Sequence, residues 1–195
     1  MSRTASFERT TKETSIKGSL NLDGTGVGSI KTGIGFLDHM LDLLKFHGGL
    51  DLTLECKGDL WIDAHHSIED IALSLGAAFN QALGDRAGVR RYATWYLPMD
   101  ECLTRTSLDL SGRPYHVFKG VLTTPTVGEF PTEMAKHFFH SFSSTARITL
   151  HQEILYGEND HHRIESLFKG LARALKEAAE VVGTAVPSSK GSLTD

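Results

Sequence analysis

Hydrophobic and polar positions follow two different periods along the chain, and these periods predict its secondary structure. Near-alternation and strand-forming residues predict strands over residues 14–22, 50–56, 106–110 and 146–155. Apolar faces at helical spacing predict helices over residues 36–44, 67–83, 133–142 and 164–182. The turn residues Asp23, Gly24 and Gly26 predict a hairpin from residues 14–22 into a strand over residues 27–32. The first half thus reads strand, strand, helix, strand, helix, and we expect the second half to repeat this order.

The second half of the chain repeats the first in letters as well as in pattern. Residues 19–22 (Ser-Leu-Asn-Leu) resemble residues 107–110 (Ser-Leu-Asp-Leu), and a Thr-Leu pair precedes His65 as another precedes His161. We infer an internal duplication within one domain spanning residues 1–195, with halves of about 1–90 and 91–186 and a tail over 187–195. Each half is expected to be an α/β unit whose helices cover one face of an antiparallel or mixed sheet.

Length and charge exclude several classes of function. With 195 residues, 40% hydrophobic and 23% charged, the chain has the composition of a globular protein. The net charge of −4 and the lack of a basic run argue against binding to nucleic acid or to anionic membranes. The N-terminal residues lack the apolar core that we would expect of a signal peptide, and no apolar stretch approaches the roughly 20 residues that span a bilayer. We expect a cytoplasmic protein in which Cys56 and Cys102 are reduced thiols.

Two copies of a His-His-x-x-Glu motif indicate metal binding. On a helix, the Glu lies on the face below the His pair, whereas the adjacent rings diverge by roughly 100° and so suit two different ions. A single His pair is more often a helix-capping or surface feature, but its repetition in the duplicated half favours a metal. Single histidines on the two shorter helices complete a set of six His and two Glu: His39, His65, His66, Glu69, His137, His161, His162 and Glu165.

The donor chemistry narrows the kind of site. Nitrogen and carboxylate ligands suit Mn, Fe, Co, Ni or Zn, and the lack of a ligating Cys argues against a purely structural zinc site. The four remaining histidines that lack this context, His47, His116, His140 and His151, are interpreted as structural or surface residues.

Other residues suit an anionic substrate such as a phosphate ester. Arginine can donate two hydrogen bonds to a phosphate, and a Ser-Ser-Lys turn offers hydroxyls, main-chain N–H groups and one positive charge. Each such residue alone is more often a solvated surface group, but the tail from Pro187 to Gly191 is a more specific signal. The candidates are Arg91, Arg113, Lys169, Ser188, Ser189 and Lys190, and Glu13 is a weakly supported acid-base candidate.

These motifs, taken in order, resemble the imidazoleglycerol-phosphate dehydratase family over nearly the whole chain. The resemblance is carried by residues 9–14, 22–26, 35–41, 63–70, 111–114, 137–139, 159–165 and 187–191. It implies an α+β fold of the ribosomal protein S5 domain 2-like type, in which each half has a mostly antiparallel or mixed four-stranded sheet with two helices on one face. It also implies two Mn(II) ions per subunit, held by the eight ligands above, and assembly into a 24-subunit shell with some ligands acting in trans.

The family's reaction is the dehydration of D-erythro-imidazoleglycerol phosphate to imidazole-acetol phosphate in L-histidine biosynthesis. The resemblance implies substrate contacts from Glu13, Arg91, Arg113, Lys169 and the tail, whereas Leu43 stands where some members have Gln. Our mechanistic hypothesis is that metal coordination favours the imidazolate form of the substrate and that Glu13, Glu69 or Glu165 moves the proton. The alternatives are a two-metal phosphoesterase or peptidase, whose sites are richer in carboxylates, and a ferritin-like storage protein built from long bundle helices.

Overall fold

The computed structural model describes residues 3–193, and its first half is a four-stranded sheet with two helices. The strands are β1 (Thr4–Thr10), β2 (Thr14–Asn21), β3 (Ile30–Lys31) and β4 (Asp51–Gly58), and the helices are α1 (Gly35–Gly48) and α2 (His65–Leu83). The strand order is β1-β2-β4-β3. Strand β3 is parallel to β4 and the other neighbours are antiparallel, so the sheet is mixed.

The second half repeats this topology. Its strands are β5 (Tyr92–Met99), β6 (Cys102–Asp109), β7 (Tyr115–Lys119) and β10 (Thr149–Tyr156), in the order β5-β6-β10-β7, and β7 is parallel to β10. Its helices are α3 (Glu133–Ala146) and α4 (Asp160–Ala178). A small hairpin of β8 (Thr126–Val127) and β9 (Phe130–Pro131) is inserted between β7 and α3. The first half has only the short link of residues 32–34 at this place.

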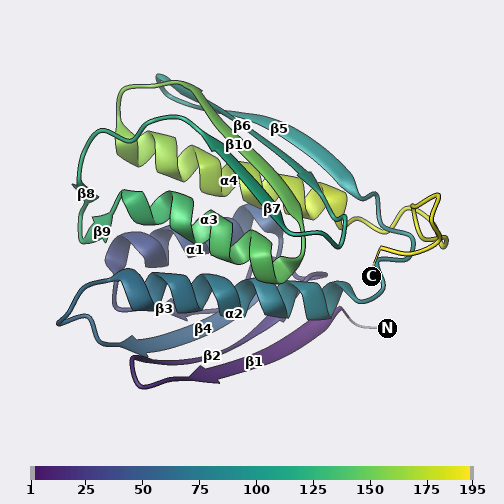
Figure 1. Cartoon of the computed structure of the whole chain (residues 1–195), viewed down its shortest axis with the longest axis horizontal. Coiled ribbons are helices and arrows are strands. Elements are labelled where there is room, and N and C mark those ends of the chain that lie inside the picture. The colour runs from purple at the N-terminus through teal and green to yellow at the C-terminus, as the bar shows by residue number, and fades with distance from the viewer. Residues whose placement is uncertain (1–2, 194–195) are drawn as a thin grey trace.

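The four helices lie between the two sheets (Figure 1). Each sheet carries the two helices of its own half on one face, and the helices of the two halves then pack together, α1 on α4 and α2 on α3. The close approach of α2 and α3 depends on Gly76, because a Cβ atom there would lie 2.4 Å from the carbonyl oxygen of Phe142. The predicted α+β class, with mixed four-stranded sheets and two helices on one face of each, is confirmed.

The core is the apolar layer between the sheets, and aromatic rings fill its centre. Phe138, Phe139 and Phe168 are fully buried and pack with ring centroids 4.7–5.7 Å apart. In β6 the buried residues alternate with partly exposed ones, which is the pattern of a sheet with one face on the core. Both cysteines are buried and free, as predicted. Within residues 3–193, the helices are all too short or too polar to cross a membrane.

The predicted hairpin between residues 14–22 and 27–32 is wrong. Strand β2 is already paired on both sides, with β1 and β4. The segment after Gly26 instead runs beside β4, where the N–H of Leu52 donates to the carbonyl of Val27 at 3.0 Å. A Cβ atom at Gly28 would lie 2.0 Å from the Leu52 carbonyl oxygen, so glycine is what lets the segment pass so close to β4.

Candidate metal centre

The first candidate ligand group joins helix α1 of the first half to helix α4 of the second. His39 Nε2 lies 3.3 Å from Glu165 Oε2, and His161 Nε2 lies 3.0 Å from the same oxygen. His161 and Glu165 are four residues apart on α4, so both point from one face of that helix. The three ligand atoms lie within 4.8 Å of one another, which is close enough to share one ion.

Lys169 belongs to the surroundings of this first group. Its Nζ lies 2.5 Å from Glu165 Oε1, one helical turn further along α4. Burial of Glu165 acts to raise its pKa, but the Lys169 ammonium and the His161 hydrogen bond outweigh it and hold that pKa below its usual value. Glu165 is therefore a buried carboxylate with one oxygen on the histidines and the other on a cation.

The second candidate group joins helix α2 to helix α3. His65 Nε2 lies 3.7 Å from Glu69 Oε2, and His137 Nε2 lies 3.4 Å from Glu69 Oε1. The rings of His65 and His137 are close, with centroids 4.8 Å apart. This group is the duplicated counterpart of the first, because α2 matches α4 and α3 matches α1 in the order of elements.

Both groups fit a divalent metal ion. Two imidazole nitrogens and one carboxylate converge in each, which is a donor set used for catalytic transition-metal sites. His137 Nε2 is buried and has no hydrogen-bond partner among the described residues, although it faces Glu69. A buried nitrogen without a partner carries a cost that a bound cation would remove. Six of the eight residues that spacing predicts as ligands are thus brought together in the two groups.

The second histidine of each motif, His66 or His162, points elsewhere. His66 Nδ1 lies 3.0 Å from Asp59 Oδ2, and His162 Nδ1 lies 2.7 Å from Glu101 Oε2. The hydrogen bond to Asp59 is the main reason that the pKa of His66 is raised. Divergence of adjacent rings was expected from helix geometry, and these two side chains lie outside both three-residue groups of their own chain.

Two acidic residues from equivalent turns lie beside these histidines, but at different ring nitrogens. Glu13, in the turn between β1 and β2, lies with Oε1 3.7 Å from His66 Nε2. Glu101, in the turn between β5 and β6, instead contacts His162 Nδ1 at 2.7 Å, and Asp100 is the residue that lies 3.7 Å from His162 Nε2. Main-chain N–H groups of residues 158 and 159 and the His162 ring lower the pKa of Glu101 to about 2. Sequence reasoning found Glu13 and missed Glu101, although the shift that aligns Ser19 with Ser107 also carries Glu13 onto Glu101.

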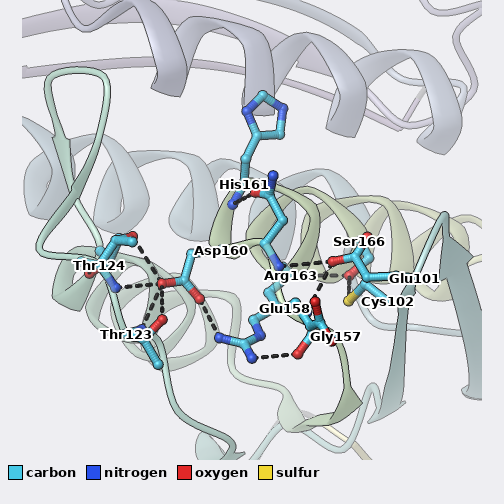
Figure 2. Close-up of polar contacts among 12 residues, drawn as sticks. Glu101, Cys102, Thr123, Thr124, Gly157, Glu158, Asp160, His161, Arg163 and Ser166 are labelled. Carbon is cyan, nitrogen blue, oxygen red and sulfur yellow. Dashed lines mark hydrogen bonds and ion pairs between the residues drawn. The ribbon is translucent and has the colours of Figure 1, made fainter.

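A buried carboxylate, Asp160, attaches the β8–β9 insertion to the start of α4. Its Oδ2 accepts from the main-chain N–H of Thr123 and of Thr124, both at 2.6 Å, and its Oδ1 accepts from Arg163 Nη1 at 2.6 Å. Figure 2 shows this cluster with the ring of His161 directed away from it. Burial acts to raise the pKa of Asp160, yet these donors hold it at about 2.

The insertion held by Asp160 forms one wall of an open cleft beside the first group. The cleft has a volume of about 560 Å³ and is lined by Thr124, Thr126 and Val127 from the insertion and by Glu101, His161 and His162 on the other side. Phe130 of β9 packs on Phe36, which in turn contacts the ring of His161. The two metal groups therefore differ in their surroundings, although their ligands are equivalent.

The predicted anion-binding residues gather at the other end of the molecule, apart from Lys169. Arg91 donates from Nη1 to the carbonyl of Pro187 at 2.7 Å and from Nε to Asp109 at 2.7 Å. Arg113 is exposed, and its neighbour Gly112 touches the carbonyl oxygen of Leu193. Figure 1 shows the tail opposite the β8–β9 hairpin. Thr194 and Asp195, the last two residues of the predicted tail, lie outside the described residues.

Comparison with known proteins agrees with this arrangement. The model of the family described as imidazoleglycerol-phosphate dehydratase matches residues 32–175. The imidazoleglycerol-phosphate dehydratase of Clostridioides difficile (strain 630) is 54% identical over 186 residues, which cover 95% of this chain and 97% of that protein. That of Exiguobacterium sp. is 51% identical over 190 residues, with 97% of each chain covered.

Solved structures of the same family also resemble this chain. The crystal structure of the enzyme from Staphylococcus aureus superposes with a TM-score of 0.82 at 40% identity, over 90% of this chain and 97% of that one. The structure of the Pyrococcus furiosus enzyme superposes with a TM-score of 0.83 at 35% identity, over 96% of this chain and 100% of that one. With two sheets enclosing its helices, the fold also excludes a ferritin-like bundle. The chain belongs to the imidazoleglycerol-phosphate dehydratase family.

Proposed function

We propose that this chain is a metal-dependent carbon-oxygen hydro-lyase of L-histidine biosynthesis. Its reaction is the dehydration of D-erythro-imidazoleglycerol phosphate to imidazole-acetol phosphate and water, in line with the family to which it belongs. The observation that carries the metal dependence is the convergence of two His and one Glu in each of two equivalent places. We assign Mn(II) as the cofactor, with two ions per subunit.

The reaction requires help with one difficult proton. The substrate loses a carbon-bound proton next to its imidazole ring and a hydroxide from the neighbouring carbon, and the resulting enol becomes the ketone product. A bound divalent ion supplies Lewis acidity that favours the deprotonated form of the substrate's ring. The chain's own residues then have to hold the ion, move the proton and fix the phosphate.

Glu13, Glu69 and Glu165 are the proposed catalytic carboxylates. Glu69 and Glu165 each face two histidines and act as ligands. Glu13 is half-exposed and is oriented toward His66 without being part of either group, so its carboxylate is free to take up the proton. Glu101 matches Glu13 in the sequence but contacts Nδ1 of His162 and is held by main-chain donors, which favours a positioning role for it.

His66 and His162 support a shared site between copies of the chain. In each, a carboxylate holds Nδ1 and leaves Nε2 as the nitrogen for a metal ion, which is the usual outer arrangement of a histidine ligand. Each local group offers three ligands, fewer than Mn(II) accepts. We propose that these two histidines complete the metal sites of neighbouring subunits in a 24-subunit shell.

The proposed substrate contacts follow from the same assembly. Lys169 beside Glu165 is placed to meet an anion near the first group. The remaining proposed contacts lie in the tail and in the segments that touch it, and they would reach the metal site of a neighbouring copy: Arg91, Arg113, Ser188, Ser189 and Lys190. Free, buried cysteines are consistent with the proposed cytoplasmic location.

The experiment is turnover of imidazoleglycerol phosphate by metal-stripped protein, with and without added Mn(II), followed by appearance of the ketone. We expect no turnover without metal and restored turnover with Mn(II). Zn(II) and Mg(II) are added in parallel to test the metal assignment. Equal rates in all samples would reject the metal dependence, and tight binding of Mn(II) without turnover would reject the substrate.

A further inference from the structure

Arg86 is the largest fully buried side chain of the described residues, at 1% exposure, and its hydrogen bonds go to uncharged acceptors. Its Nη1 donates to the carbonyls of Leu110 at 3.2 Å and Leu193 at 3.1 Å. Its Nη2 donates to Asn80 Oδ1 at 2.6 Å and to the carbonyl of Ala146 at 3.3 Å. Burying a guanidinium costs free energy, and its hydrogen bonds to these segments have to offset that cost.

The segments gathered by Arg86 are those that carry the anion-binding candidates. Leu110 comes immediately before the Ser111-Gly112-Arg113 turn, and Leu193 comes shortly after Lys190. The two segments touch, because a Cβ atom at Gly112 would lie 1.9 Å from the Leu193 carbonyl oxygen and 3.1 Å from Arg86 Nη1. Leu193 is itself buried, at 4% exposure. Arg86 thus joins the far end of the tail to the turn that presents Arg113.

The near end of the tail is held by a different arginine. Arg91 Nη1 donates to the carbonyl of Pro187, so the part of the tail between Pro187 and Leu193 is a loop fixed at both ends. Within it, the N–H of Gly191 donates to the carbonyl of Ser188 at 3.0 Å, which closes a turn. Ser189 and Lys190, at the tip of this turn, are exposed.

We propose that Arg86 is a positioning residue for recognition of the substrate's phosphate group. It does not touch the substrate, but it fixes the distance between the Arg113 turn and the Ser189-Lys190 turn. Donors that are ordered before binding lose less entropy when the anion arrives, so the effect is on affinity. The inference rests on the proposed function, because it assigns these turns to the phosphate ester.

The experiment uses Leu193→Ala, which removes the buried side chain at the tail's far end and leaves Arg86 in place. We expect KM for imidazoleglycerol phosphate and the inhibition constant of inorganic phosphate to rise together, by about tenfold, with kcat within about twofold. Trypsin cleavage after Lys190 should be at least about fivefold faster, because the released loop opens more often. Val182→Ala, at an exposed position before the tail, is the matched control and should change neither constant.

Arg86→Lys and Arg86→Met extend the test to Arg86 itself. Lysine keeps the charge but provides fewer donors, so it should give part of the rise in KM, and methionine should give all of it. If Arg86→Met does not fold, Arg86→Lys decides the role of Arg86, because it keeps the buried charge while losing part of the guanidinium's hydrogen bonds. Faster trypsin cleavage with unchanged KM and unchanged phosphate inhibition would overturn the proposal. Unchanged trypsin cleavage, or a fall in kcat alone, would also overturn it. Failure of the proposed function would show separately, as lack of turnover by the unmodified protein.

Discussion

His39 Nε2 lies 3.3 Å from Glu165 Oε2, although 126 residues separate them in the chain. His39 comes from α1 of the first half and Glu165 from α4 of the second. The contact exists because the helix layers of the two halves pack on each other, and the same packing joins Glu69 to His137. Each half of the chain therefore supplies candidate ligands to both groups.

Substitution of one proposed carboxylate ligand should weaken metal binding at its own group and leave metal binding at the other group intact. Glu165→Gln removes the charge from the first group, and we expect Mn(II) affinity there to fall by at least about a hundredfold. Glu69→Gln is the matched change in the second group. Calorimetric titration of metal-stripped protein should show one of the two proposed ions lost in each variant. Loss of both ions in either variant would contradict two separate groups.

Glu13→Gln tests the proposed acid-base role. The change keeps the shape of the side chain and removes its ability to take a proton, so kcat should fall by about 10²–10⁴-fold while Mn(II) content stays intact. Metal analysis and steady-state kinetics measure the two effects. Glu101→Gln is the symmetry-matched comparison and should lower kcat less, because Glu101 is held by its own main-chain donors. Full activity of Glu13→Gln would remove Glu13 from the mechanism.

Lys169→Met should weaken substrate binding near the first group. Loss of one charge-assisted hydrogen bond of about 1.5–3 kcal/mol predicts a fall in kcat/KM of about ten- to a hundredfold. Lys169→Arg keeps the charge and should retain part of that activity. Steady-state kinetics of the two variants give the comparison. If both behave alike, the charge of Lys169 is not what the substrate meets.

Asp160→Asn should destabilise the protein far more than loss of an exposed ion pair. The Asp160 side chain is 1% exposed and its carboxylate bonds to Arg163 and to two main-chain N–H groups, so we expect a loss of about 3 kcal/mol. Glu180→Gln breaks the exposed pair with Arg90 and should cost at most about 1 kcal/mol. Urea unfolding measures both. Equal losses would mean that the insertion does not depend on Asp160.

His116 should make the fold sensitive to acid. Burial, with weaker effects from His140, Lys136 and His151, lowers its pKa from 6.5 to about 4, and interaction of the protonated ring with the Gln152 side chain opposes this shift only in part. Between these pH values His116 binds a proton in the unfolded chain but not in the folded chain. Stability is therefore lost as pH falls from about 6.5 to about 4, by up to about 1.4 kcal/mol per pH unit.

His116→Phe removes this titration and should flatten the acid side of the stability curve. Urea unfolding at several pH values between 4 and 6.5 compares the variant with the parent protein. His140→Gln removes one of the weaker effects on this pKa and should reduce the slope far less than His116→Phe does. Parallel curves for His116→Phe and the parent would show that His116 is not responsible.

Local patterns were enough to find the helices and the strands β2, β4, β6 and β10. Helix α2 was expected over residues 67–83 and spans His65–Leu83, because its apolar face is continuous. Strands β1, β5 and β7 were not found, since in β1 and β7 most side chains are exposed or only partly buried and give little hydrophobic alternation. The hairpin after Asp23 was predicted from turn residues alone, which do not say which neighbour a strand will take.

The sequence by itself determined the family, and it predicted the ligand types and the duplication, because short motifs fix which side chains share a helical face. Tertiary structure decided which ligands meet: His39 joins Glu165 and His65 joins His137 across the halves. It also separated Lys169 from the tail and buried Arg86 beneath it. These contacts follow from helix-on-helix and tail-on-turn packing between segments far apart in the chain, with a sequence separation of 126 between His39 and Glu165 and of 107 between Arg86 and Leu193, and no local period along the chain encodes such packing.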